Sequence, residues 1–201
     1  PVNLPNVPPS NLANGQIEAV EALMRCSVNG ENISPGQYIP VAEKTGLVVR
    51  LGEWSLLQGA LQARLLQDAG HQTKVAINVS RAQLISPKFT QALHAALICS
   101  NVKPQLVELE LTESLFMYIS DTVQANLKNA ISAGVSLSID DFGTGYSCLA
   151  NLKDIPAKKL KLDRAFVTVL PEDRRALAVV RAMTQFGHEL GMTVVAEGCE
   201  R

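Results

Sequence analysis

The stretch VSLSIDDFGTG, residues 135–145, predicts a strand that ends in two acidic residues and a glycine-hinged loop. Its aliphatic residues fall on one face of an extended chain, and its serines and Asp140 fall on the other face. Asp140 and Asp141 then stand side by side, and adjacent carboxylates repel each other unless a cation or a shared proton lies between them. The alternative is a turn without chemistry, since Asp and Gly dominate turns, so the rest of the chain must decide.

The composition favours an α/β protein and gives no sign of a nucleic-acid partner. The chain has 201 residues, a formal net charge of -1, 47% hydrophobic residues and 18% charged residues. This length suffices for one domain with a sizeable core or for most of a larger one. The apolar composition suits strands that are covered on both faces. Duplex nucleic acid is not an expected partner, because there is no basic excess.

The cysteines and histidines are scattered rather than grouped. No C-x-x-C pair is formed by Cys26, Cys99, Cys148 and Cys199, and the histidines His71, His94 and His188 are equally dispersed. We expect reduced thiols in a cytoplasmic protein, not a disulfide or zinc framework. No apolar run is long enough to cross a bilayer and no signal peptide is found, so any membrane tether of the parent protein is expected outside this chain.

Strand and helix patterns alternate along most of the chain. Period-two patterns predict strands at residues 17–24, 75–80, 106–112, 135–141, 159–163 and 193–197. Helices are expected over residues 39–44, 51–69, 89–99, 122–133, near 148–152 and over 174–190, several of them followed by glycine. The second helix has its apolar positions at Trp54, Leu57, Leu61, Leu65 and Ala69. Residues 1–14 are expected to be a linker or a distorted first strand, with a turn at Asn14-Gly15, and residues 27–36 a loop.

This order predicts a parallel sheet of the TIM-like (β/α) barrel type. Strand-then-helix units in series build right-handed parallel sheets. Each predicted strand has one aliphatic face, while the other face ends in a polar or ionisable residue: Glu21, Asn78, Glu110, Asp140, Lys161 and Glu197. In a (β/α) barrel the residues at the carboxyl ends of the strands carry the chemistry. A dinucleotide-binding sheet would need a glycine-rich phosphate loop after its first strand, and none is present.

The residues at these strand ends indicate a site for hard divalent cations. Acids and an amide without His or Cys form an all-oxygen site, which favours Mg²⁺ or Mn²⁺ over zinc or copper. Asp140 and Asp141 could hold two ions with one carboxylate bridging them, an arrangement that clamps both the attacking and the leaving oxygen of a phosphodiester. A buried Lys161 beside the ions would orient the attacking water or neutralise charge on the phosphate.

Six short motifs, in order, resemble the EAL-domain phosphodiesterases that hydrolyse cyclic di-GMP. The motifs are Glu21-Ala22-Leu23 followed by Arg25, Asn78-Val79-Ser80, Glu110-Leu111-Thr112-Glu113, Asp140-Asp141-Phe142-Gly143-Thr144-Gly145, Lys161-Leu162-Asp163 and Ala196-Glu197-Gly198. The resemblance runs from about Gly15 to Glu200, so residues 15–201 are expected to be an EAL-type domain. Segments Ser34-Pro35-Gly36, Ile39-Pro40 and Leu51-Gly52-Glu53-Trp54 fit the family too.

The resemblance implies a two-metal hydrolysis of cyclic di-GMP to linear pGpG and a role for each matching residue. The metal ligands would be Glu21, Asn78, Glu110, Asp140 as the bridge, and Asp141. Lys161 would hold the nucleophilic water, and Glu197 would be a further metal-binding or water-orienting carboxylate. Glu113 would pin the loop from Asp141 to Tyr146, which couples metal binding to the contacts of a homodimer. Leu23 and Arg25 would contact the substrate, and Glu200 is a weaker match.

The sequence departs from the family pattern at two places. Cys26 stands where the family usually has Trp, in an unusual stretch from Ser27 to Asn32, which affects the expected substrate packing near Arg25. The family's Gln-Gly-Tyr motif and Ser-Arg-Pro turn are not found before Arg201, and the usual first strand is missing or distorted within residues 1–11. We therefore expect a barrel without its C-terminal strand and helix in this chain.

Two alternatives to a cyclic di-GMP phosphodiesterase stay open. A non-catalytic cyclic di-GMP receptor would have the same fold, although so many carboxylates around an anionic ligand make little electrostatic sense without metal. An enolase-like barrel would use Lys161 as a base beside metal-bound carboxylates. Adjacent Asp140 and Asp141 suit a bridged metal pair better than such a single-ion site.

Overall fold

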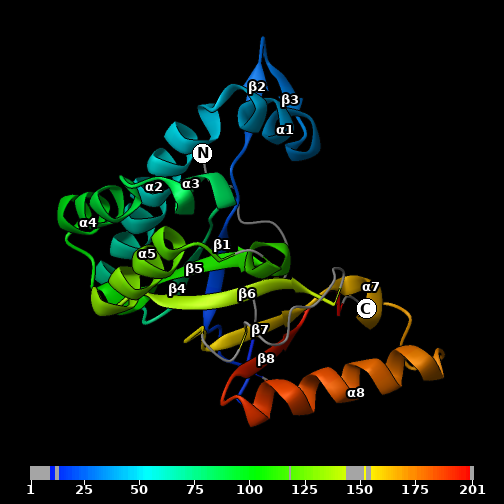
Figure 1. The fold of residues 1–201 in the computed structure, drawn as a ribbon. Coiled ribbons are helices and arrows are strands. Elements are labelled where there is room, and N and C mark those ends of the chain that lie inside the picture. Colours follow the sequence, from blue (N-terminus) through cyan, green and yellow to red (C-terminus); the bar gives the residue numbers. More distant parts are fainter. Residues whose placement is uncertain (1–9, 12–13, 118, 144–151, 153–154, 200–201) are drawn as a thin grey trace. The chain divides into compact units, whose positions relative to one another are not determined.

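The computed structural model describes residues 10–11, 14–117, 119–143, 152 and 155–199 (Figure 1). The chain divides into two compact units. The first unit comprises Pro1–Leu109 and Ser120–Val135, and the second comprises Glu110–Ile119 and Ser136–Arg201. Strand β5 passes from the first unit to the second after Leu109. None of the helices in these described ranges is long and apolar enough to span a membrane.

The first unit holds strands β1, β4 and the start of β5, in that order, together with a hairpin and most of the helices. The strands are β1 Ala19–Ala22, β2 Cys26–Val28, β3 Glu31–Ile33, β4 Lys74–Asn78 and β5 Val107–Thr112. The helices are α1 Pro35–Thr45, α2 Leu47–Asp68, α3 Arg81–Ile85, α4 Phe89–Ser100, the 3-10 turn η1 Pro104–Leu106 and α5 Asp121–Ser132. Strands β1 and β4 pair in parallel, with Ala22 opposite Ile77.

The second unit holds the end of β5 and then β6, β7 and β8 in that order. Its elements are the 3-10 turn η2 Glu113–Met117, β6 Ser136–Phe142, β7 Lys159–Leu162, α7 Arg164–Val167, α8 Arg174–Glu189 and β8 Thr193–Ala196. The pairs β6–β7 and β7–β8 are parallel. The core of this unit consists of fully buried side chains that include Leu111, Phe116, Leu137, Ile139, Phe142 and Leu160.

Most predicted elements are confirmed, with ends that shift by a few residues. The turn at Asn14-Gly15 forms as expected: Gly15 has a φ of +67°, the Gln16 amide donates to Asn14 Oδ1, and Ser10 bridges Ile17. The expected linker or first strand at residues 1–14 lies mostly outside the described residues, as does the helix near 148–152.

The loop predicted at residues 27–36 is wrong, because β2 and β3 form an antiparallel hairpin there. Its two-residue turn is Asn29-Gly30, and both residues have a positive φ, of +53° and +84°. A turn of this kind matches the twist of the paired strands and is the strongest short-range hairpin signal in a sequence. Helices α3 and α7 were also not predicted, and each begins after a capping residue, Ser80 and Asp163 respectively.

Helix α2 packs through Val48, Leu56 and several small residues rather than through the predicted row of large apolar ones. Trp54 and Leu65 are 50% and 60% exposed, whereas Gly52, Gly59, Ala60 and Ala63 are buried. A Cβ atom added at Gly59 would collide with the fully buried side chain of Ile77 in β4. The glycine thus lets the helix approach the strand more closely than any larger residue would.

We expect Gly59→Val to lower the free energy of unfolding by about 3 kcal/mol, because the added methyl groups overpack the site of Ile77. A urea unfolding curve measures the change. Gly36→Val in α1 is the matched control: a Cβ there meets no atom within 4 Å, and Gly and Val differ little in helix propensity, so its effect should be within about 0.5 kcal/mol. Equal unfolding midpoints for the two variants would contradict this account of α2.

Candidate active site

A β-bulge brings Asp140 and Asp141 to the same side of the sheet. Residue Ile139 of β6 stands opposite Leu160 of β7, but Phe142 stands opposite Leu162, so two acidic residues of β6 face one residue of β7. Such a bulge inserts one extra residue, bends the strand and re-aims its side chains. Asp141 adopts the left-handed conformation with a φ of +53°. The predicted strand therefore runs on through both acids instead of stopping at them.

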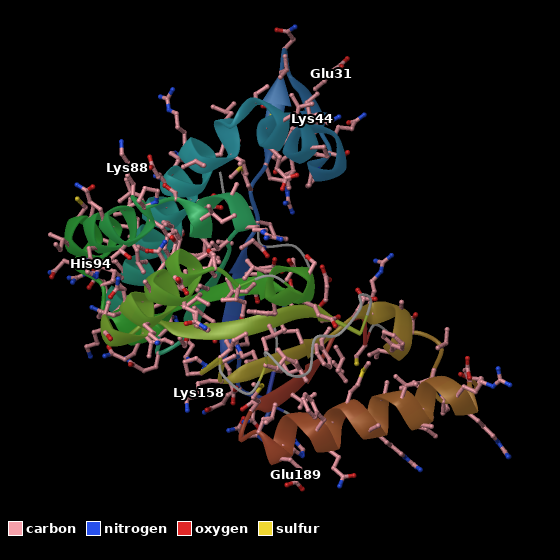
Figure 2. The ribbon with its side chains drawn as sticks, in the orientation of Figure 1. Glu31, Lys44, Lys88, His94, Lys158 and Glu189 are labelled. Atoms are coloured by element: carbon pink, nitrogen blue, oxygen red, sulfur yellow. The ribbon has the colours of Figure 1, made fainter. Side chains whose placement is uncertain are left out.

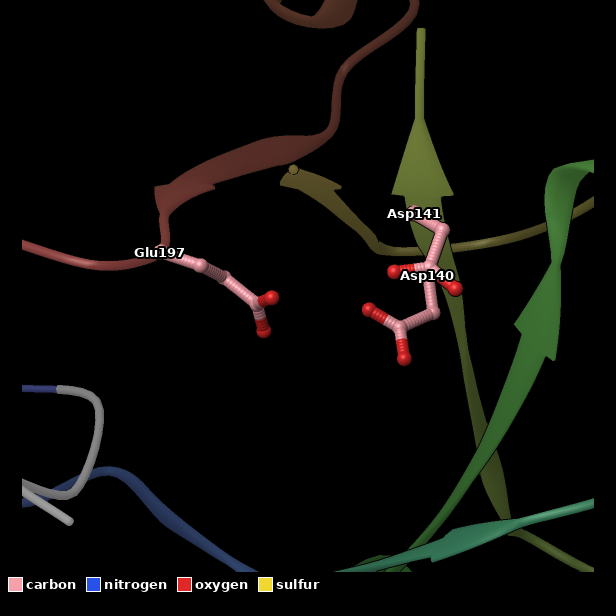
Figure 3. A group of neighbouring side chains, drawn as sticks. All are labelled: Asp140, Asp141 and Glu197. Atoms are coloured by element: carbon pink, nitrogen blue, oxygen red, sulfur yellow. The ribbon is translucent and has the colours of Figure 1, made fainter. Parts of the chain in front are cut away.

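Glu197, which follows β8, completes a group of three carboxylates. One ligand oxygen from each of Asp140, Asp141 and Glu197 lies within 4.8 Å of the others. Figure 3 shows the Glu197 carboxylate facing the two aspartates across a small gap. Asp140 is buried, Glu197 is half-buried and Asp141 is exposed, so the group has a protected side and a side open to solvent.

Lys161 lies among the carboxylates of the second unit. Its ammonium nitrogen is 2.9 Å from Glu110 Oε1, 3.0 Å from Asp140 Oδ1 and 2.8 Å from Glu197 Oε1. The side chains of Lys161 and Glu110 are 5% and 3% exposed, so this is an ion-pair cluster with little solvent screening.

The pKa of Lys161 is raised above its ordinary value. Burial alone lowers it, because desolvation disfavours the ammonium, but attraction to Glu110 and Asp140 and the hydrogen bond to Glu197 raise it by more. Lys161 is therefore a cation at neutral pH.

Glu113 fixes the backbone just after the aspartates. The Gly143 amide donates to Glu113 Oε2 at 2.8 Å, and the Glu113 side chain is buried. A hydrogen bond to an ionised acceptor is among the stronger ones in proteins. The loop from Asp141 to Tyr146 is thus held at Gly143, while residues 144–146 lie outside the described part of the chain.

The remaining predicted site residues belong to the first unit. Asn78 Nδ2 donates to Glu21 Oε1 at 2.6 Å, which brings the ends of β1 and β4 together as expected. Leu23 is half-buried and Arg25 is exposed just after β1. Each of these four stays a predicted ligand or substrate contact, and Glu200 lies outside the described residues.

Tyr38 is a residue near Arg25 that the sequence reasoning did not single out. The Tyr38 hydroxyl and Arg25 Nη1 both donate to the Met24 carbonyl, at 3.1 and 3.2 Å. Burial and the nearby Cys26 raise the pKa of Tyr38 against the lowering effect of Arg25, so the phenol stays protonated and can donate. In the sequence, Tyr38 lies between Ser34-Pro35-Gly36 and Ile39-Pro40. The resemblance of these two segments to the family could have pointed to Tyr38.

The donor set fits a hard divalent cation. All candidate ligands in the second unit are carboxylates, and the histidines are exposed, among them His94 on α4 (Figure 2). The buried oxygen Asp140 Oδ1 accepts no hydrogen bond among the described residues, although Lys161 lies 3.0 Å away as an ion-pair partner. Carboxylate oxygens of this kind are the ligands that Mg²⁺ and similar cations prefer.

Comparison with known proteins identifies the family to which this chain belongs. Residues 7–201 match the model of the EAL domain. The chain belongs to the EAL domain family. Its fold is accordingly the TIM-like (β/α) barrel type predicted from the strand ends, and the predicted family is confirmed.

Two solved structures of EAL proteins are similar to this chain. The c-di-GMP complex of the PaMucR phosphodiesterase is 40% identical, has a TM-score of 0.89, and is matched over 96% of this chain and 79% of that one. The EAL enzyme Bd1971, in its cAMP- and cyclic-di-GMP-bound form, is 31% identical with a TM-score of 0.88, over 96% of this chain and 54% of that one.

Curated relatives carry names from cyclic di-GMP metabolism. The bifunctional diguanylate cyclase/cyclic di-GMP phosphodiesterase MucR of Pseudomonas aeruginosa is 41% identical over 93% of this chain and 28% of its own length. The cyclic di-GMP phosphodiesterases NbdA of Pseudomonas aeruginosa and PdeR of Escherichia coli are 36% and 33% identical, over 94% and 92% of this chain and 24% and 28% of their own lengths. The chain thus spans less than a third of the length of these relatives.

We expect Lys161→Met to lower the free energy of unfolding by about 3 kcal/mol or more when measured with a chelator present, because it leaves Glu110 and Asp140 buried without their cation. The control is Asp68→Asn, which breaks the Arg64–Asp68 pair at its exposed end but keeps the hydrogen bond from Arg64 to the Asn101 carbonyl, and it should cost no more than about 1 kcal/mol. Denaturant titration of both variants gives the comparison. A Lys161→Met protein as stable as wild type would show that the cluster is not held by its lysine.

Proposed function

We propose that this chain is a metal-dependent phosphodiesterase domain that hydrolyses cyclic di-GMP to linear pGpG with two Mg²⁺ or Mn²⁺ ions. The observation that carries the proposal is the bulge that presents Asp140 and Asp141 together, with Glu197 within 4.8 Å, in a chain of the EAL domain family. Relatives named as cyclic di-GMP phosphodiesterases support the choice of substrate.

The proposed metal ligands are Glu21, Asn78, Glu110, Asp140 and Asp141, with Asp140 as the bridge. Two bound ions would clamp the attacking and leaving oxygens of a phosphodiester and lower the pKa of a shared water. Their donors would come from the ends of several strands, which is where barrel enzymes carry their chemistry. Arg25 and Leu23 are the proposed substrate contacts, and Arg25 suits a phosphate because its guanidinium offers paired donors.

Lys161 acts in this proposal as a fixed positive charge. Since its pKa is raised, it keeps its protons, orients the attacking water and offsets the negative charge that grows on the phosphate. Glu197 lies 2.8 Å from the ammonium and is partly open to solvent, and in this proposal it would accept a hydrogen bond from that water and receive its proton. Glu113 would restrain Asp141 through its hydrogen bond with the Gly143 amide.

The proposal also extends to partners. Cyclic di-GMP is the proposed substrate, and a homodimer formed through the region after Asp141 is the proposed assembly, by resemblance to the family. A homodimer would make the observed Glu113–Gly143 bond a link between the aspartates and the interface.

We expect the purified chain to convert cyclic di-GMP to pGpG with Mn²⁺ and to lose that activity in EDTA. Asp140→Asn should reduce the turnover by about 100-fold or more, because it removes a bridging charge from the reacting centre. Chromatographic separation of substrate and product measures the rate. The matched control is Asp121→Asn on the exposed first turn of α5, which should keep wild-type turnover.

The same assay separates the enzyme from a receptor. If the wild-type chain binds cyclic di-GMP tightly in Mn²⁺ but leaves it uncut, the domain is a receptor and the proposed hydrolysis is wrong.

A further inference from the structure

Phe142 and Gly143, which follow the aspartates, pack against apolar side chains from α7 and α8. Phe142 is 2% exposed, and its ring is stacked on Phe186 of α8 with the centroids 6.3 Å apart and the planes 3° from parallel. We call Phe166 of α7 with Met183 and Phe186 of α8 the apolar bed. Stacked aromatic pairs of this kind contribute beyond their buried area.

Gly143 is held tightly between this bed and Glu113. Its φ is +102°, and a Cβ atom added there would lie 2.6 Å from Met183 Cε and 2.8 Å from Phe166 Cε2. Its amide donates to Glu113 Oε2 at 2.8 Å. The backbone at Gly143 therefore has little freedom to move either towards the bed or away from the carboxylate.

The restraint on Phe142 and Gly143 also restrains the backbone of Asp141, which precedes them. The left-handed backbone conformation of Asp141 is unfavourable for a residue with a side chain, although less so for Asp than for most. Such conformations persist where the surrounding structure determines them. The bulge opposite Lys161 restrains Asp141 on one side, and the packed Phe142 and Gly143 restrain it on the other.

Helix α8 also packs directly on the strand that leads to Glu197. A Cβ atom added at Gly187 would lie 2.6 Å from Val194 Cγ2, so the helix backbone closely approaches β8. Glu197 follows the end of β8 and continues its pairing, since its amide donates to the Leu162 carbonyl. One helix thus supports the chain on both sides of the gap between Asp141 and Glu197.

We propose that Met183 and Phe186 of α8, with Phe166 of α7, are positioning residues that set the place of the Asp141 carboxylate relative to Asp140 and Glu197. The inference rests on the proposed two-metal function and adds the residues that tune one of its sites. Groups behind metal ligands commonly change metal affinity by about 10- to 100-fold when they are lost. Since the bed packs against the residues just after Asp141, which the proposed function assigns to one ion, its loss should weaken that ion far more than the other.

The test measures Mn²⁺ binding to the whole purified chain by calorimetry, below the unfolding temperature of every variant. We expect wild type to bind two ions, and Phe186→Ala to weaken one of them by about 10-fold or more while the other changes by less than about 2-fold. Phe186→Leu keeps most of the apolar volume, so it should fold and show a smaller loss at the same ion. Restored turnover of Phe186→Ala at high Mn²⁺ would agree with a weakened site.

Two controls separate positioning from general stability. Val179→Ala changes α8 at a side chain that is 37% exposed, and Leu93→Ala empties a fully buried position of α4 in the first unit. Both should leave the two affinities unchanged, even though Leu93→Ala costs about 2 to 5 kcal/mol of stability.

Three results would overturn the inference. They are wild-type affinities in both Phe186 variants, equal weakening of the two ions, and the same selective weakening in Leu93→Ala. A wild-type chain that binds only one ion would contradict the proposed two-metal function itself, and the inference with it. Failure of the proposed hydrolysis alone would look different, as two-ion binding without hydrolysis of cyclic di-GMP, and in that case the affinities still decide whether the bed positions Asp141.

Discussion

The second unit depends on the attraction between one buried ammonium and the carboxylates around it. Glu110, Asp140 and Glu197 each lie within 3.0 Å of Lys161 Nζ. Carboxylates this close to one another repel strongly in a poorly solvated site, and removing them from water is costly. The lysine offsets both effects, and the same attraction keeps it charged. The cluster therefore holds Lys161 as an ammonium beside three carboxylates.

The second constraint on the structure is that two helices lie very close to strands. Glycine residues in these helices make the close approach possible. Gly59 lets α2 reach Ile77 of β4 in the first unit, and Gly187 lets α8 reach Val194 of β8 in the second. In both helices a small residue stands where a larger one would collide with a strand side chain. A strand whose outer face is covered this closely has little room to shift along its axis, so the polar residues at its carboxyl end keep their places.

The sequence alone predicted the order of the elements and the polar strand ends because those signals are local. Aliphatic alternation and the glycines after helices depend on neighbouring residues only. The hairpin at Asn29-Gly30 and helix α3 were missed although their signals were present, as an Asn-Gly turn and as the Ser80–Gln83 capping box. The packed face of α2 was not predicted, since Leu56, Gly52 and Gly59 are buried whereas Trp54, in the predicted apolar row, is exposed.

The bulge at Asp140 and Asp141 shows why the site could be predicted only in part. Alternation along an unbroken strand places neighbouring side chains on opposite faces, so the sequence pattern by itself separates the two aspartates. They face the same gap only because β6 has one residue more than β7 between two pairs, Ile139–Leu160 and Phe142–Leu162. Phe142, at the end of this bulged segment, packs on Phe186, more than 40 residues further along the chain. The two acids can be recognised from their motif, whereas Phe186, the proposed positioning residue, lies in a helix whose sequence looks like any amphipathic helix.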